Sequence, residues 1–111
     1  MNLMSAQQQP VLRYVVLHHS GFGEEHYDLM LELESGSKLS TWRLPHWPPR
    51  EGDSFTPLAD HRRDYLEYEG PISGNRGSVK RVAAGHHEIV EYTPERILIR
   101  LESGVVLAIR K

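Results

Sequence analysis

The sequence contains no cysteine, and this absence excludes a disulfide scaffold, a thiolate metal site and a cysteine nucleophile. No apolar run approaches the roughly 20 residues that a membrane-spanning helix needs, so we expect no association with a membrane. Positive charge is not in excess, because 13 Lys and Arg residues stand against 15 Asp and Glu residues and the net charge is -2. This balance excludes a protein that binds nucleic acid through bulk positive charge.

The remaining composition is that of one small globular domain. The chain has 111 residues, of which 39% are hydrophobic and 25% are charged, and both fractions are ordinary for a folded protein. Residues 1–10 are polar and lack the basic flank and apolar stretch of a signal peptide, so we expect a disordered tail followed by a single domain over residues 11–111. By elimination, we expect a soluble, intracellular, cytoplasmic protein.

Short apolar segments separated by turn residues every eight to twelve positions or so predict an all-β fold. The expected strands are residues 11–18, 26–34, 39–44, 78–84, 86–92, 97–102 and 105–110. The second of these alternates strictly, so that one face carries Tyr27, Leu29, Leu31 and Leu33 and the other carries His26, Asp28, Met30 and Glu32. Only residues 60–68 are compatible with a helical turn. We therefore predict a compact antiparallel β-barrel with one short helix or helical turn.

Seven histidines are many for so short a chain, and three of them lie near an aspartate. His26 and Asp28 are two positions apart, so on a strand their side chains project side by side. A glycine-rich loop precedes them, so the end of the first strand, with His18 and His19, can return beside them. Two imidazoles and one carboxylate leave positions open on a divalent ion, which suits Mn²⁺ better than a closed four-ligand zinc site. The alternative is that His26 and Asp28 belong to a polar strand face in solvent.

A second candidate pair is His61 and Tyr65. These residues are four positions apart, so one helical turn would place them on the same side. A titratable imidazole and a neutral hydroxyl that converge suit an oxyanion or a phosphate. The alternative is an exposed turn whose tyrosine packs on the barrel.

Three further features carry less specific patterns. Trp42 is expected in the core, and Arg43, with the opposite parity, points either into a pocket or into water. Residues 70–87 contain Arg76 and two other basic residues but no acid, which fits either a phosphate-bearing ligand or a solvated strand edge. His86 and His87 are expected on a surface strand.

Taken in chain order, five motifs resemble the 3′-phosphoesterase module of the bacterial DNA-repair ligase D family. They are YVVLHH, HYDLMLELE, LSTWRLP, ADHRRDYLEYEGPISG and RGSV, which together span residues 14–79. The family pattern reads F-V-V-x-x-H, then H-Y-D-x-R-L-E, then S-W-x-V-P, then E-D-H-P-x-x-Y-x-x-F-E-G-x-I-P-x-G. The specific part of the match is H-Y-D-L-x-L-E followed by D-H-x-x-x-Y-x-x-Y-E-G.

The resemblance implies a compact antiparallel β-barrel and a manganese-dependent hydrolase. Family members trim the 3′ ends of DNA or RNA by hydrolysing a phosphodiester or phosphomonoester, a step in DNA end repair. Matched position by position, the resemblance implies that His19, His26 and Asp28 ligate Mn²⁺ or another divalent cation. It also implies catalytic roles at the phosphate for His61 and Tyr65. The implied partners are DNA or RNA 3′ ends and a repair polymerase or ligase, and we expect a monomer.

The chain departs from the family pattern at two cationic positions. The arginine two residues after the aspartate is Met30 here, and the lysine after the S-W-x-V-P proline is His46. We therefore expect phosphate or substrate binding by Arg43, His46, Arg62 and Arg76. The alternative to an active phosphoesterase is a weakened or inactive module that binds metal and nucleic-acid ends or a repair partner.

Overall fold

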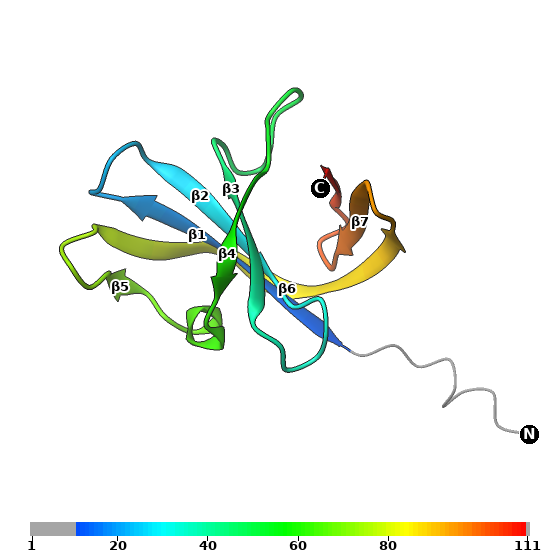
Figure 1. Cartoon of the computed structure of the whole chain (residues 1–111), viewed down its shortest axis with the longest axis horizontal. Coiled ribbons are helices and arrows are strands. Elements are labelled where there is room, and N and C mark those ends of the chain that lie inside the picture. Colours follow the sequence, from blue (N-terminus) through cyan, green and yellow to red (C-terminus); the bar gives the residue numbers. More distant parts are fainter. Residues whose placement is uncertain (1–10, 111) are drawn as a thin grey trace, which may run out of the picture.

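The computed structural model describes residues 11–110 and forms one antiparallel sheet (Figure 1). Its elements are β1 (Leu12–Ser20), β2 (His26–Leu31), β3 (Leu39–Leu44), β4 (Thr56–His61), the 3-10 turn η1 (Arg63–Leu66), β5 (Gly70–Pro71), β6 (Ser78–Tyr92), β7 (Arg96–Leu101) and β8 (Val106–Arg110). The prediction of an antiparallel β fold with one helical turn is confirmed. The tail predicted over residues 1–10 lies outside the described residues. Within residues 11–110, no helix has the length and apolar character needed to cross a membrane.

The sheet is a curled half-barrel with the strand order β4-β3-β2-β1-β6-β7-β8, and β5 pairs with β6 beside this path. The long strand β6 explains the curl, because it pairs with β1 over residues 78–87 and with β7 over residues 87–92 (Figure 1). Val16 pairs with Ala83 and Leu17 pairs with Arg81, which leaves Val82 as a bulge that increases the local twist. The prediction of separate strands over 78–84 and 86–92 is therefore wrong, since one strand of 15 residues bends instead of turning back.

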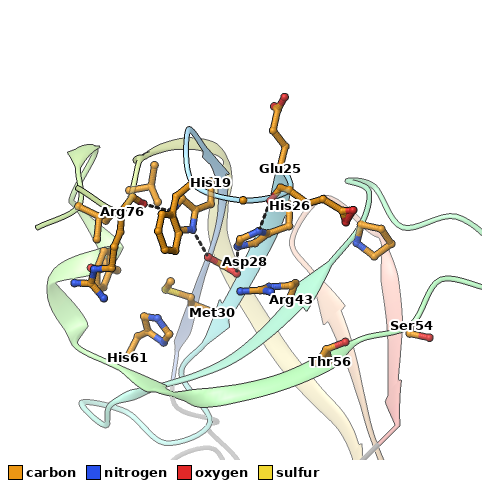
Figure 2. Close-up of a pocket in the computed structure, with 17 residues that line it drawn as sticks. His19, Glu25, His26, Asp28, Met30, Arg43, Ser54, Thr56, His61 and Arg76 are labelled. Carbon is orange, nitrogen blue, oxygen red and sulfur yellow. Dashed lines mark hydrogen bonds and ion pairs between the residues drawn. The ribbon is translucent and has the colours of Figure 1, made fainter. Parts of the chain in front are cut away.

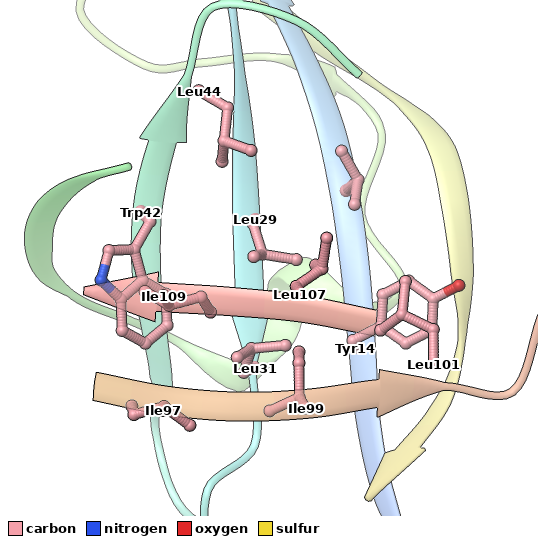
Figure 3. Packing of buried hydrophobic residues seen from close by; sticks show 11 residues of the cluster. Tyr14, Leu29, Leu31, Trp42, Leu44, Ile97, Ile99, Leu101, Leu107 and Ile109 are labelled. Atoms are coloured by element: carbon pink, nitrogen blue, oxygen red, sulfur yellow. The ribbon is translucent and has the colours of Figure 1, made fainter. Parts of the chain in front are cut away.

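One face of the sheet encloses the main hydrophobic core. Figure 3 shows side chains of β7 and β8 packed against those of β1, β2 and β3. The alternating residues Leu29 and Leu31 are fully buried there, and Trp42 joins them at 7% exposure, as the sequence predicts. Full burial of one such leucine contributes about 1.5–3 kcal/mol to folding.

The opposite face of the sheet is also covered. A second buried cluster there consists of Val15, Leu17, Met30, Leu39, Leu66 and Val79, with Tyr65 and Ile72 packed against it. His26 and Asp28 share this face and are only 7% and 5% exposed. The alternative of a polar strand face in solvent is therefore wrong. Two imperfectly apolar side chains lie where a purely structural strand would present leucine, and their burial needs a reason.

A buried carboxylate, Glu32, ties η1 to the sheet on this face. Its Oε1 accepts the Arg13 N–H at 2.7 Å, and its Oε2 pairs with the Arg63 guanidinium at 2.6 Å. Burial alone would raise the pKa of Glu32, but these hydrogen bonds and the Gly36 N–H outweigh it and hold the pKa below its ordinary value. The ion pair thus fixes the turn that carries Tyr65.

His87 is a buried structural residue rather than a surface one. Its side chain is on the inner part of β6, and Nε2–H donates to the Glu32 carbonyl at 2.7 Å. The prediction for His87 is wrong because the β6 bulge and bend carry it under the β2 end. Burial lowers the pKa of His87 below its ordinary value of 6.5, since the charged ring loses its hydration.

We expect stability to fall with acidification below pH 6.5, in part through His87. The unfolded chain takes up a proton there while the folded chain resists it, so the free energy of unfolding drops by up to about 1.4 kcal/mol per pH unit from this residue. The variant H87Q keeps an N–H donor for Glu32 and has no titrating ring. Urea unfolding from pH 7.5 to 5 should therefore give a shallower slope for H87Q than for the wild type. The control is H86Q, which removes the exposed neighbour, and equal slopes in the two variants would contradict this role for His87.

Candidate functional site

The predicted metal ligands converge at one end of the β1–β2 pair. His19 and His26 face each other in the strand register, and Asp28 follows two residues later on the same face of β2. One nitrogen from each imidazole and one oxygen from the carboxylate all lie within 4.8 Å of one another. Figure 2 shows the three side chains pointing toward a common centre. The strand pairing produces this cluster, because a shift of one residue would move these side chains to the core face.

Backbone carbonyls fix which nitrogen of each histidine is free. His26 Nδ1–H donates to the Glu24 carbonyl at 3.1 Å, and His19 Nε2–H donates to the Arg76 carbonyl at 2.7 Å. A carbonyl oxygen only accepts, so in the neutral rings the proton sits on these nitrogens. His26 Nε2 and His19 Nδ1 therefore present lone pairs to the centre. Metal-bound histidines commonly have this arrangement, in which the other ring N–H is held by a carbonyl or a carboxylate.

The centre contains acceptors with no donor. His26 Nε2 lies 3.3 Å from Asp28 Oδ1, and both atoms are buried without a hydrogen-bond partner in the described part of the chain. The second carboxylate oxygen, Asp28 Oδ2, lies 3.9 Å from His19 Nδ1. Lone pairs that face each other in a buried site are unfavourable unless a cation lies between them. The mixed nitrogen and oxygen donor set fits a divalent ion such as Mn²⁺.

His18 is excluded from this centre by its direction. Its ring stacks on Tyr27 at a centroid distance of 4.9 Å, and its Nε2 lies 2.8 Å from Glu25 Oε1. Adjacent residues on a strand point to opposite faces, so only one of the two neighbouring histidines can join His26 and Asp28. The structure brings in His19, which is the ligand that the family resemblance implies.

A cleft of about 630 Å³ opens beside the centre and is lined by four further predicted residues: Arg43, His61, Tyr65 and Arg76. Arg43 is the direct cross-strand partner of Asp28, so the two side chains leave the sheet on the same face. Figure 2 shows the guanidinium of Arg43 extending below His26 and Asp28. No ion pair or hydrogen bond engages the Arg43 side chain within residues 11–110, which leaves its charge available to a ligand.

A bulge in β4 brings His61 into the cleft. Thr41 pairs with Leu58 while Leu39 pairs with His61, so β4 has one extra residue between these pairs. Without it, residue 61 would fall on the opposite face from Leu58; with it, both share the cleft face. His61 Nδ1–H donates to the Ala59 carbonyl at 2.9 Å, which leaves Nε2 as the free nitrogen.

Tyr65 joins His61 from η1, with the two ring centroids 5.6 Å apart in an edge-on arrangement. The two residues therefore converge as predicted, but a strand end followed by a 3-10 turn replaces the single helical turn that their spacing indicates.

Two of the predicted substrate-binding residues lie elsewhere. His46 is in the β3–β4 loop, where its Nδ1 pairs with Asp53 at 2.9 Å, and it does not line the cleft. The Arg50 N–H and the His46 ring hold the pKa of Asp53 below its ordinary value, so this group is a loop clamp. Arg62 is exposed between β4 and η1 and also lies outside the lining. Proximity to a motif in the sequence did not bring these two cations to the site.

Arg76 has a role that the sequence does not reveal. Its guanidinium bonds to the Ser73 carbonyl at 2.7 Å, whereas its own carbonyl orients His19. A backbone carbonyl carries no residue signature, so the contributions of Arg76 and Glu24 to the centre had no signal in the sequence. A scan against protein-family models gives no match, and a search of curated proteins gives none. The resemblance to the ligase D module therefore stays a prediction from motifs.

We expect Mn²⁺ to bind with one ion per chain, and D28N to weaken binding by more than about 100-fold. The reason is that even loss of a residue behind a ligand costs about 10–100-fold in affinity. Titration calorimetry and the loss of the free Mn²⁺ electron-spin resonance signal measure this directly. The matched control is H18Q, which alters the neighbouring imidazole on the other face. Equal affinity in D28N and the wild type would contradict the assignment.

Gly77 tests whether the close approach of two loops supports the centre. A Cβ at Gly77 would lie 2.1 Å from the Ser20 carbonyl oxygen, whereas a Cβ at Gly36 would meet nothing within 4 Å. Their φ values, +78° and +83°, impose the same backbone strain. G36A should lower the free energy of unfolding by about 1–2 kcal/mol and G77A by about 2–5 kcal/mol. G77A should also weaken Mn²⁺ binding, because Arg76 orients His19. Equal losses of stability in the two variants would show that the loop contact is unimportant.

Proposed function

We propose that the protein is a metal-dependent phosphoesterase that hydrolyses a phosphodiester or phosphomonoester at the 3′ end of DNA or RNA. The observation that carries the proposal is the pair of unsatisfied acceptors, His26 Nε2 and Asp28 Oδ1, buried at 3.3 Å beside an open cleft. Strongly perturbed polar arrangements of this kind are typical of functional sites. The motif resemblance supplies the reaction class.

His19, His26 and Asp28 would hold the divalent ion, and the donor chemistry favours Mn²⁺ or a similar ion. When bound, such an ion supplies a Lewis acid that offsets negative charge on the phosphate. The histidines contribute two neutral ligands and the aspartate one negative charge. The centre therefore keeps net positive charge for an anionic substrate.

The other cleft residues act on the phosphate oxygens. His61 offers Nε2, which in its protonated form can deliver a proton to the leaving oxygen. The Tyr65 hydroxyl donates a hydrogen bond to a second oxygen without adding charge, since it stays neutral near pH 7. The edge-on packing of the two rings restricts their rotamers and thus keeps both groups directed into the cleft.

Arg43 replaces the cation that the family pattern has at position 30. Met30 is 1% exposed at the base of the cleft, so this position offers bulk and no charge. Arg43 leaves the neighbouring strand opposite Asp28, one diagonal step from Met30. A guanidinium at this point can reach a phosphate with two parallel N–H donors, as an arginine on β2 would from the other side.

A second candidate function is a module that binds nucleic-acid ends without turnover. Met30 is the observation that favours it, because the loss of a phosphate-holding arginine reduces transition-state stabilisation before it abolishes binding. Metal and phosphate would then bind in the same cleft, with no product released.

The decisive assay uses a 3′-phosphorylated primer annealed to a template, with Mn²⁺, and measures the phosphate released. We expect release by the wild type and none by D28N. R43Q should lower kcat/KM by about 100-fold, the usual effect of removing one donor that stabilises transition-state charge. R62Q is the control, because it removes an exposed arginine outside the cleft. Turnover by R43Q at the wild-type rate would remove Arg43 from the mechanism, and metal-dependent binding without turnover by the wild type would favour the non-catalytic module.

A further inference from the structure

The side of the cleft next to His19 is apolar. It is lined by Phe22 from the β1–β2 loop, Ile72 from the β5–β6 loop and Val79 from β6. Val79 is buried at 5% exposure, whereas Phe22 is 54% exposed. A half-exposed phenylalanine at the rim of a polar cleft is an unsatisfied apolar surface that a flat ring can cover.

Phe22 is held by the backbone rather than by its own side-chain packing. Gly21 and Gly23 on either side have φ values of +82° and +69°, which keep the loop tight. Gly77 approaches so closely that its Cβ would lie 3.1 Å from the Phe22 nitrogen. The Gly77 carbonyl in turn accepts the Ile72 N–H at 2.8 Å. The two loops therefore present Phe22 and Ile72 on the same side of the cleft.

The strand register arranges the cleft from cationic to apolar. Arg43 on β3 pairs with Asp28 on β2, and His19 on β1 pairs with Val79 on β6. His26 on β2 faces His19 and completes the row. Because neighbouring strands lie about 4.8 Å apart, the apolar side is within one nucleotide's length of the candidate metal centre. A ligand with a phosphate at one end and a flat apolar group at the other matches this order.

The charge of the cleft limits how much nucleic acid it can hold. Its ionised lining consists of three acidic residues, Glu24, Glu25 and Asp28, against two basic ones, Arg43 and Arg76. A groove that follows a phosphate backbone carries a clear excess of Lys and Arg. This cleft instead suits one terminal phosphate and its own nucleoside.

We propose that Phe22, with Ile72 and Val79, forms a subsite for the base of an unpaired 3′-terminal nucleotide. The base stacks on Phe22 and the terminal phosphate is directed toward Arg43. The proposal rests on the proposed phosphoesterase function and specifies its substrate as a frayed or single-stranded end. A single aromatic face accepts any base, so no sequence preference is expected. A paired terminal base cannot stack there without leaving its duplex.

Two substrates test the subsite. Both are single-stranded oligonucleotides with a 3′-phosphate, and one ends in a stable abasic tetrahydrofuran residue. F22A should raise KM about 10-fold for the end that carries a base and leave KM for the abasic end unchanged, because only the first can stack. F22W should resemble the wild type on both, and V82A, which trims an exposed apolar side chain on β6 outside the cleft, should change neither. An equal effect of F22A on both substrates, or no effect on either, would overturn the subsite.

A binding measurement separates failure of the subsite from failure of the proposed function. The fluorescence of F22W is titrated with the same two oligonucleotides, and the wild type, with its two tryptophans, supplies the background. Extra quenching by the base-bearing end alone supports stacking even if neither substrate is hydrolysed. Hydrolysis without this quenching overturns the subsite and leaves the phosphoesterase function standing.

Discussion

The rest of the site depends on one unfavourable contact, between the His26 Nε2 lone pair and the Asp28 Oδ1 lone pair, 3.3 Å apart in a buried position. The Glu24 carbonyl holds the His26 proton on the far nitrogen, so the ring in its neutral form cannot relieve the contact by donating to Asp28. A cation between the two atoms converts the contact into coordination. The fold tolerates the arrangement because the large apolar core lies on the other face of the sheet, where these side chains do not reach.

The two-faced sheet explains how a domain of 111 residues accommodates both a core and a cleft. The curl set by β6 wraps β7 and β8 over one face, and the pair formed by Glu32 and Arg63 fastens η1 over part of the other. What remains open on the second face is the end of the β1–β2 pair, where His19 and His26 lie. Backbone geometry at Gly77 closes the site from the β6 side. Stability and function thus use separate faces of the same strands.

The sequence predicted those features that arise from local alternation and from pairing of adjacent strands. The core side of β2 followed from its period of two, and the meeting of His19 with His26 and Asp28 followed from one tight connection. Features that depend on an extra residue in a strand were beyond it. The bulges that place His61 in the cleft and carry His87 into the interior are set by tertiary packing, which leaves no periodic signal. Hydrogen bonds from backbone carbonyls were equally invisible, since any residue type can provide them.

A crystal structure of the protein with Mn²⁺ and sulfate, recorded at a wavelength where manganese scatters anomalously, tests the central claim most directly. The account predicts a single anomalous peak bonded to His19 Nδ1, His26 Nε2 and the Asp28 carboxylate, with sulfate between that peak and Arg43. Manganese bound only elsewhere, or a His26 ring turned so that Nε2–H donates to Asp28, would contradict it.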